Sequence, residues 1–343
     1  MSKIKVGIIN VTGYAGVELA RLLYTHPKME LCSITGRSAA GQKLGEVFPH
    51  LADIELTIAS ELDEVDLAFS AMPHKASAEI IIPLVKSGTR VVDISADFRL
   101  KDADKYLQWY DFAHPAPELL QKAVYGLPEL HRAEIAKASL IANPGCYPTG
   151  ALLALAPAVK ECLIESDIII DSKSGVSGAG RTLSLTTHYA EATDNVCAYS
   201  VHGHRHLSEI IQELETLNLV FSPSVTFLPH LVPTSRGILS SCYAKQKEGK
   251  AIKGKAELIK LYRSYYKGEP FVRVVDNPPE TKQTWGSNLC LVYPTLDVRT
   301  GRLIVISCLD NLVKGAAGQA IQNANIMFGF PETDGLEALP VYP

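Results

Sequence analysis

The segment NPGCYPTGA, residues 143–151, places a single thiol where a helix is expected to begin. Cys146 follows a Pro-Gly pair, and Pro148 and a run of small residues come after it. Because proline is favoured in the first turn of a helix, Cys146 should lie near a helix N-terminus, where the helix dipole stabilises a thiolate. The N–H groups there could also hold the oxyanion formed when the thiolate attacks a carbonyl. A lone cysteine is more often a small buried apolar residue, so this chemistry needs partners.

The stretch SVHGHRHLSEI, residues 200–210, offers such partners in three histidines at alternate positions. In an extended backbone, His202, His204 and His206 would project to one side, as general acids or bases for the thiol or as metal ligands. No carboxylate or cysteine pair with metal-ligand spacing accompanies them, so we expect acid/base chemistry and no metal. A solvated run of histidines is the alternative interpretation.

A Ser/Gly-rich loop, SKSGVSGAGR at residues 172–181, could bind an anion. Backbone amides and hydroxyl groups in such loops contact phosphate or carboxylate, and Arg181 would add positive charge. The alternative is a flexible turn that binds nothing.

The N-terminal segment VGIINVTGYAGVELARLL spreads Gly7, Gly13 and Gly16 over a predicted strand, turn and helix. Glycines at such a turn let a dinucleotide pyrophosphate approach the backbone and rest on the N–H groups of the helix N-terminus. Asn10 stands where the first glycine of the turn is usual, and asparagine is among the residues that best tolerate a left-handed backbone. A tight strand-to-helix turn without a ligand is the alternative.

The end of the second predicted strand reads SITGRSAAG and lacks the acidic residue that would hold an adenosine 2′-hydroxyl. Arg37 and Ser38, with Ser33 as a further candidate, can instead grip a 2′-phosphate, because a guanidinium matches phosphate geometry and a carboxylate would repel it. This pattern favours NADP(H) over NAD(H), and a solvated Arg37 is the alternative.

The elements that must position these residues change in character near Cys146. Before it, short apolar runs alternate with helical patterns, which predicts βαβ units and an α/β domain with a Rossmann-type parallel sheet. The candidate strands are residues 5–9, 29–34, 56–59, 65–72, 90–95 and 139–143, and the clearest helices are 17–26 and 75–88.

After Cys146, one helix at 149–161 precedes longer strands of alternating polarity. They predict an α+β domain with a mostly antiparallel sheet and helices on one face. The candidate strands are 167–176, 224–233, 237–246, 288–298 and 302–310. Asp310 and Asn311 are possible caps of a final helix that includes Ala317, Ile321, Ala324 and Met327.

Composition excludes several classes of function. A chain of 343 residues suggests two domains at about 150 residues each. The formal net charge of −4 gives no electrostatic case for nucleic-acid or membrane-surface binding, and no apolar stretch is long enough to span a bilayer. The seven cysteines are scattered without CxxC spacing, so we expect reduced thiols in a cytoplasmic protein whose partners are small molecules or copies of itself.

Taken together, these segments resemble the N-acetyl-γ-glutamyl-phosphate reductase family of arginine biosynthesis nearly from end to end. The matching segments are GYAGVELARLL, ISADFRL, YGLPELHR, NPGCYPT, SGVSGAGR, GHRHLSEI, PTSRGIL and DNLVKGAAGQA. The resemblance implies an NADP-binding domain of residues 1–145 and 311–343 and a catalytic and dimerisation domain of residues 146–310. It also implies a homodimer or homotetramer.

The resemblance implies that Cys146 attacks the acyl phosphate of N-acetylglutamyl 5-phosphate, and that NADPH reduces the resulting thioester to the semialdehyde. His206 would activate the thiol and later supply a proton, and we prefer it to His204 because it directly precedes the helix-like LSEI. Asn311 matches a position that would hold the nicotinamide carboxamide, so the final helix should return to the cofactor domain.

The remaining implied contacts fall into two sets. Ser95 and Asp97 could line the cleft with Arg99, although a structural role for Asp97 and Arg99 is the alternative. The cofactor set is Gly13, Tyr14, Ala15, Gly16, Arg37, Ser38 and Asn311, and the substrate set is Arg99, Ser174, Ser177, Gly178, Arg181 and Arg205.

Two other functions remain open at this point. One is reduction of a carrier-protein-bound aminoadipyl phosphate in lysine biosynthesis, by a related family that is expected to lack the NPGCYPT form of the nucleophile segment. The other is a catalytically silent NADP-binding regulator, which the complete set of cysteine, histidines and Ser/Gly loop disfavours. Asn10 departs from the small residue usual in the family's glycine turn, which bears on how tightly the pyrophosphate binds.

Overall fold

The computed structural model describes residues 3–250, 252 and 254–343. The chain divides into two compact units: Met1–Pro144 with Ala316–Ala338 (unit 1), and Gly145–Gly315 with Leu339–Pro343 (unit 2). The final helix, α11 (Gly318–Met327), therefore belongs to the N-terminal unit, whereas Asn311 belongs to unit 2.

Unit 1 is built on a six-stranded sheet in the order β2-β1-β3-β4-β6-β5, in which every pair of neighbours is parallel. This confirms the predicted Rossmann-type sheet. The strands are β1 (Ile4–Ile9), β2 (Met29–Ile34), β3 (Leu67–Ser70), β4 (Arg90–Asp93), β5 (Val124–Tyr125) and β6 (Leu140–Ala142).

Two details of unit 1 differ from the sequence prediction. The two-residue strand β5 was missed, because it is too short to carry a periodic signal. The run 56–59 was predicted as a strand, but Thr57 bridges Lys43 and Ala59 bridges Thr35. These two isolated bridges go to different segments, so no continuous ladder forms.

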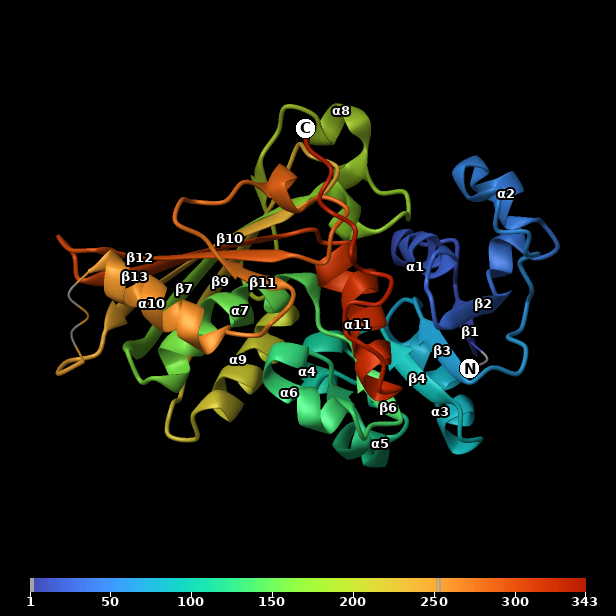
Figure 1. The fold of residues 1–343 in the computed structure, drawn as a ribbon, viewed down its shortest axis with the longest axis horizontal. Helices are drawn as coiled ribbons and strands as arrows, with labels where there is room; N and C mark the ends of the chain where they lie inside the picture. The colour runs from blue at the N-terminus through green and yellow to red at the C-terminus, as the bar shows by residue number, and fades with distance from the viewer. Residues whose placement is uncertain (1–2, 251, 253) are drawn as a thin grey trace. The chain divides into compact units, whose positions relative to one another are not determined.

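Helices α1 (Tyr14–Tyr24) and α3 (Ala76–Lys86) follow β1 and β3, as predicted. Helix α1 packs on β1 and β2, α3 packs on β4, and α11 packs on β4 and α6 (Figure 1). The other helical elements of unit 1 are α2 (Leu44–Val47), α4 (Asp104–Tyr110), α5 (Pro117–Lys122), α6 (Pro128–Ile135), η1 (Arg37–Ala39) and η2 (Pro49–Leu51).

The strand order of unit 1 has a consequence for ligand binding. Strand β2 lies on one side of β1 and β3 on the other, so the order of the chain reverses between β1 and β3. In open parallel sheets, ligands bind at such a switch point, beyond the carboxyl ends of the strands. The Asn10 turn follows β1 at this edge of the sheet.

Unit 2 contains a seven-stranded mixed sheet in the order β11-β12-β13-β10-β7-β9-β8. Only the β11/β12 and β7/β9 pairs are parallel, which confirms the mostly antiparallel prediction. The strands are β7 (Ile164–Gly175), β8 (Cys197–Ala198), β9 (Ser224–Val232), β10 (Ile238–Gln246), β11 (Val272–Val274), β12 (Cys290–Asp297) and β13 (Arg302–Leu309).

Helix α7 (Cys146–Lys160) is the central helix of unit 2 and is buried along nearly its whole length. It packs against β7, β10, β12 and β13, with α9 (His206–Leu217) and α10 (Lys255–Tyr265) beside it (Figure 1). A helix that is apolar all round must be buried, and the small residues after Cys146 allow close packing on the sheet. The thiol therefore sits at the end of a rigid element.

The other helical segments of unit 2 are short. They are η3 (Val176–Ala179), η4 (Leu185–Thr187), α8 (Tyr189–Ala192) and η5 (Thr281–Thr284), and the π-helical turn η6 (Val313–Ala317) begins in unit 2 and ends in unit 1. No described helix is both long and apolar enough to cross a membrane.

Candidate active site

Cys146 is the first residue of α7, and Gly145 is its N-cap. The carbonyl of Gly145 accepts the backbone N–H of Thr149 at 3.0 Å and the hydroxyl of Thr149 at 2.9 Å. The half-buried Cys146 thiol thus lies at the positive end of a long helix, where a thiolate is stabilised. The helix starts at the cysteine, three residues earlier than the sequence pattern indicated.

A buried carboxylate that the sequence did not single out holds this helix start. Glu209 is fully buried in the first turn of α9, and its Oε2 accepts the backbone N–H of Gly145 at 2.9 Å. Glu209 lies one turn after His206, so a single residue links the histidine segment to the nucleophile segment. The sequence signal for it was weak, because a glutamate in a first turn is ordinary.

The histidines come together, but not through an extended strand as predicted. Residues 200–205 form a turn, α9 begins at His206, and His202 is exposed. The ring centroids of His204 and His206 are 4.7 Å apart, and both rings contact the ring of Tyr147, at 5.7 and 5.9 Å. Among the described residues, no group of three or more His, Cys, Asp or Glu side chains could hold a metal ion.

The two histidines differ in protonation chemistry. Nδ1 of His204 accepts the backbone N–H of His206 at 3.1 Å, so a neutral His204 carries its proton on Nε2. Burial, followed by the neighbouring positive charge of Arg205, lowers the pKa of His204 to about 4. At neutral pH, His204 is therefore an uncharged hydrogen-bond donor and a weak base.

Two tyrosines complete the surroundings of the nucleophile. The hydroxyl of Tyr199 donates to the hydroxyl of Tyr147 at 2.9 Å. Burial raises the pKa of Tyr199 to about 12, and burial also raises the pKa of Tyr147. Both phenols therefore stay protonated at neutral pH, and each presents an apolar ring with a polar hydroxyl group. Neither tyrosine was predicted from the sequence as a site residue.

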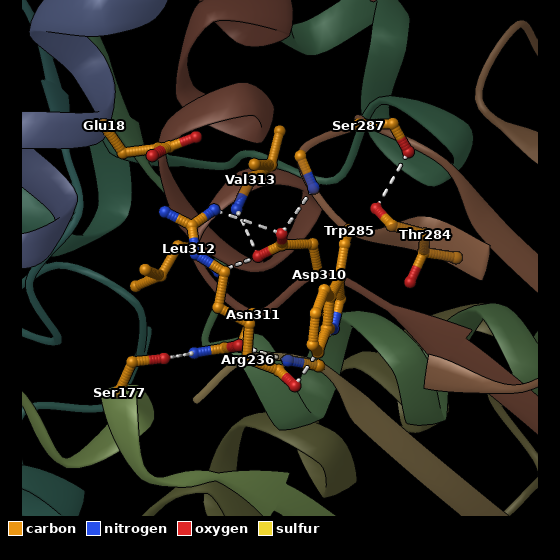
Figure 2. Close-up of polar contacts among 12 residues, drawn as sticks. Glu18, Ser177, Arg236, Thr284, Trp285, Ser287, Asp310, Asn311, Leu312 and Val313 are labelled. Atoms are coloured by element: carbon orange, nitrogen blue, oxygen red, sulfur yellow. Dashed lines mark hydrogen bonds and ion pairs between the residues drawn. The ribbon is translucent and has the colours of Figure 1, made fainter. Parts of the chain in front are cut away.

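The predicted Ser/Gly loop lies next to Asn311. The Nδ2 of Asn311 donates to the hydroxyl of Ser177 at 2.9 Å, and its Oδ1 accepts the N–H of Gly237 at 2.8 Å (Figure 2). Ser174 is buried, and its hydroxyl donates to the carbonyl of Gly175. A β-carbon on Gly178 would lie 3.0 Å from Oγ of Ser174, which favours glycine there.

The two arginines predicted to contact the substrate, Arg181 and Arg205, are exposed.

Asp310 organises the loops around Asn311. Its Oδ1 accepts the N–H groups of Leu312 and Val313, at 2.8 and 3.3 Å, so it holds the start of the π-helical turn η6, whereas the N-cap of α11 is Ala317 and not Asp310 or Asn311. Its Oδ2 accepts the N–H of Gly286 at 2.8 Å and pairs with the guanidinium of Arg236 at 3.2 Å (Figure 2). Arg236 belongs to the matched segment PTSRGIL, but it was not predicted as a site residue.

In unit 1, the glycine turn joins β1 to α1 through one left-handed residue and a close backbone contact. Asn10 adopts φ 65°, the left-handed conformation predicted for it. Gly13 is the N-cap of α1 and supplies no side-chain cap, and a β-carbon on Gly16 would lie 2.5 Å from the carbonyl oxygen of Asn10. Tyr14 is exposed and Ala15 half-buried at the start of α1. The helix N-terminus thus presents backbone N–H groups, which fit a pyrophosphate.

The predicted 2′-phosphate contacts divide into exposed and buried residues. Arg37 and Ser38 are exposed at η1, just beyond the end of β2. Ser33 is buried, and its hydroxyl accepts the N–H of Asp63 at 3.0 Å. Of the three residues, only Arg37 and Ser38 are exposed to solvent.

Arg99 lies in unit 1, where its guanidinium meets backbone carbonyls. Its Nε donates to the carbonyl of Asn143 at 2.8 Å, and Nη2 donates to the carbonyl of Ile94 at 2.7 Å. Asp97 accepts the N–H groups of Lys75 and Ala78 at the start of α3. These contacts favour the structural interpretation of both side chains over substrate binding.

The carboxylates near Arg99 form a second buried network in unit 1. Asp93 accepts hydrogen bonds from the hydroxyl groups of Ser77 and Ser95 and from the N–H of Ser95. Burial, followed by the nearby charge of Asp97, raises the pKa of Asp93 to about 6. Ser95 is thereby bonded to Asp93, so this network stabilises the loop after β4.

Comparison with known proteins adds two family models. The model described as "Semialdehyde dehydrogenase, NAD binding domain" matches residues 5–138, and the one described as "Semialdehyde dehydrogenase, dimerisation domain" matches residues 146–311. The N-acetyl-gamma-glutamyl-phosphate reductase of Dehalococcoides mccartyi strain 195 is 57% identical over 344 residues, covering 100% of both chains. That of Geobacter metallireducens is 50% identical, covering 99% of this chain and 100% of the relative.

Solved structures share the fold at low sequence identity. Aspartate semialdehyde dehydrogenase II of Vibrio cholerae, complexed with ASA, aligns with a TM-score of 0.71 at 16% identity, covering 96% of this chain and 99% of that one. Aspartate semialdehyde dehydrogenase of Candida albicans, with NADP, aligns with a TM-score of 0.71 at 17% identity, covering 95% and 99%. At such identities the likeness concerns the fold alone.

Proposed function

Because the chain belongs to the N-acetyl-γ-glutamyl-phosphate reductase family, we propose that it reduces N-acetyl-γ-glutamyl phosphate to N-acetylglutamate 5-semialdehyde with NADPH and releases phosphate. The observation that carries the proposal for this chain is the position of Cys146 as the first residue of α7. The relatives' names favour this function over reduction of a carrier-bound aminoadipyl phosphate and over a silent regulator.

The first step makes a thioester on Cys146. The thiolate attacks the carbonyl carbon of the acyl phosphate, a C–S bond forms, the C–O bond to the phosphoryl group breaks, and inorganic phosphate leaves. The helix dipole of α7 favours the thiolate, and burial of Glu209 against Gly145 keeps the helix start in place. A thioester accepts hydride where a carboxylate would not.

Unit 1 would hold the cofactor. The N-terminus of α1, between Gly13 and Gly16, fits the pyrophosphate, and the exposed Arg37 and Ser38 fit a 2′-phosphate. When bound, NADPH supplies the hydride that the thioester carbonyl carbon accepts. Asn311 keeps one amide hydrogen and one oxygen lone pair beyond its bonds to Ser177 and Gly237, enough for a carboxamide contact.

The histidines would divide the proton transfers. His206 takes the proton of the Cys146 thiol and later returns one as the C–S bond of the hemithioacetal breaks. His204, neutral with its proton on Nε2, donates a hydrogen bond that orients the substrate. Anionic groups of the substrate would meet Ser177, Arg181 and Arg205, where the chain offers hydroxyl and guanidinium donors.

The proposal is tested by offering purified protein each of the two acyl phosphates with NADPH and following NADPH oxidation and phosphate release. We expect turnover with N-acetyl-γ-glutamyl phosphate and much less with the aminoadipyl phosphate on its carrier. Cys146→Ser should abolish turnover while leaving NADPH binding nearly intact, because an alcohol is a poor nucleophile there. If Cys146→Ser kept more than a tenth of the wild-type turnover, the thioester route would be wrong.

Two broader expectations accompany this function. Residues 146–311 match a model described as a dimerisation domain, which supports a homodimer formed through unit 2, alone or within a tetramer. Sedimentation of the purified chain distinguishes these states from a monomer. A cytoplasmic location, expected for a biosynthetic enzyme, is measured by cell fractionation.

A further inference from the structure

Asn10 occupies the point of unit 1 where a dinucleotide turn must be formed. It follows β1 directly, at the carboxyl ends of the parallel strands and beside the β1/β3 switch point. Its φ of 65° lies in the region that disfavours most side chains, so the conformation is held by its surroundings.

The side chain of Asn10 spans the switch point. Its Nδ2 donates to the carbonyl of Ala71, just beyond β3, at 2.9 Å, and its Oδ1 accepts the hydroxyl of Thr12 at 3.3 Å. Its backbone N–H donates to the hydroxyl of Thr35, just beyond β2, at 3.3 Å. One residue therefore connects the ends of three neighbouring strands.

The start of α1 rests on the same residue. A β-carbon on Gly16 would lie 2.5 Å from the Asn10 carbonyl oxygen, so the helix packs directly against that carbonyl. A β-carbon on Gly13 would lie 3.5 Å from Nδ2 of Asn10. The position of the helix N–H groups thus depends on where Asn10 holds the turn.

We propose that Asn10 is a positioning residue for the dinucleotide pyrophosphate. Glycine would provide the left-handed backbone alone, whereas asparagine provides it and also fastens the turn to Ala71 across the switch point. The inference rests on the proposed function, because it assumes that unit 1 binds NADP(H). By this proposal, Asn10 holds the N-terminus of α1 in position before the cofactor binds.

The proposal predicts a pattern that a general loss of stability would not produce. NADPH and NADH share the pyrophosphate and differ at the 2′-phosphate. Loss of the hydrogen bond between Asn10 and Ala71 should raise the dissociation constants of both nucleotides by the same factor. A substitution of Arg37 should raise only the dissociation constant of NADPH.

The experiment measures dissociation constants for NADPH and NADH by nucleotide fluorescence, with thermal unfolding, on the full chain. Asn10→Gly keeps the left-handed backbone accessible but removes the hydrogen bond to Ala71, so we expect near-native thermal unfolding. The dissociation constants of both nucleotides should rise about three- to tenfold, which corresponds to about one hydrogen bond. Asn10→Asp removes the donor and adds a negative charge beside the pyrophosphate, so it should weaken both further.

A matched control is Asp111→Gly, which changes an exposed residue of unit 1 that also has positive φ, 56°, after α4. It should leave both constants unchanged. Native binding of both nucleotides by Asn10→Gly, or weakening of NADPH alone, would overturn the proposal. Normal nucleotide binding by a wild-type chain that turns over neither acyl phosphate would contradict the proposed substrate, and the binding comparison would still decide the role of Asn10.

Discussion

A β-carbon placed on Gly315 would lie 2.8 Å from Cβ of Cys146, closer than two such atoms can pack. The backbone at Gly315 cannot easily yield, because its N–H donates to the carbonyl of Asp310 at 2.9 Å. The Asp310 carboxylate in turn holds Leu312 and Val313. The turn after β13 therefore packs directly against Cys146 at Gly315 and limits where the nucleophile can lie.

We expect Gly315→Ala to displace Cys146 and lower turnover by roughly 10- to 100-fold, because small misplacements of a nucleophile cost about that much. NADPH binding should change little, and the rate of Cys146 alkylation should change with turnover. Gly254→Ala is the control, since a β-carbon there meets nothing within 4 Å. Wild-type turnover in Gly315→Ala would show that the turn moves aside without displacing Cys146, and would contradict the prediction.

The hydrogen bond from Gly145 to Glu209 leads to a second prediction. Glu209→Ala leaves a buried N–H unpaired, which should lower the free energy of unfolding by about 1–3 kcal/mol and reduce turnover. Glu209→Gln keeps an oxygen acceptor, so it should retain the wild-type free energy of unfolding and turnover if the hydrogen bond to Gly145 is sufficient. Glu213→Gln, a buried glutamate on the same helix, is the control. If Gln behaves like Ala at position 209, the negative charge is required instead.

The assignment of acid/base roles is tested by the alkylation rate of Cys146 against pH, beside steady-state kinetics. His206→Asn should lower turnover by roughly 100- to 10,000-fold and slow alkylation at neutral pH. His204→Asn should mainly raise KM for the acyl phosphate and leave the profile unchanged, because His204 is already neutral there. A profile that moves for His204→Asn and not for His206→Asn would reverse the assignment.

The lowered pKa of His204 also links stability to pH. The unfolded chain takes up a proton near the ordinary value of 6.5, whereas the folded chain does so only near 4. Stability is therefore full above pH 6.5 and falls as pH drops toward 4, by at most about 3 kcal/mol. Urea unfolding at pH 7 and pH 5 should show this loss in wild type and less of it in His204→Gln. The exposed His202→Gln is the control, and equal losses in all three would contradict the burial argument.

Cofactor choice is tested at Arg37. Arg37→Asp should raise KM for NADPH by roughly 10- to 100-fold, because a charge-assisted pair with the 2′-phosphate is worth about 1.5–3 kcal/mol. NADH lacks that phosphate and is the internal control. Equal effects on both nucleotides would show that Arg37 acts elsewhere.

Local sequence signals predicted most of the strands of both sheets and the left-handed backbone of one residue. The run MELCSI is strand β2 with the predicted bounds, and the Pro-Gly pair before Cys146 marks the start of α7. The left-handed conformation of Asn10 follows from its residue type and its place after β1. These features depend on neighbours in the chain, whose sterics and hydrogen bonding the sequence itself contains.

Contacts between distant residues were decided only by tertiary packing. Glu209 meets Gly145 across 64 positions of sequence, and Arg99 turns to the carbonyl of Asn143 across 44. The three histidines were predicted to share one side of a strand, yet a turn before α9 brings His204 and His206 together and leaves His202 exposed. Residue type limits which bonds a side chain can make, but the partner is chosen by the burial of helices and sheets around it, since a buried polar group must be paired wherever the fold places it.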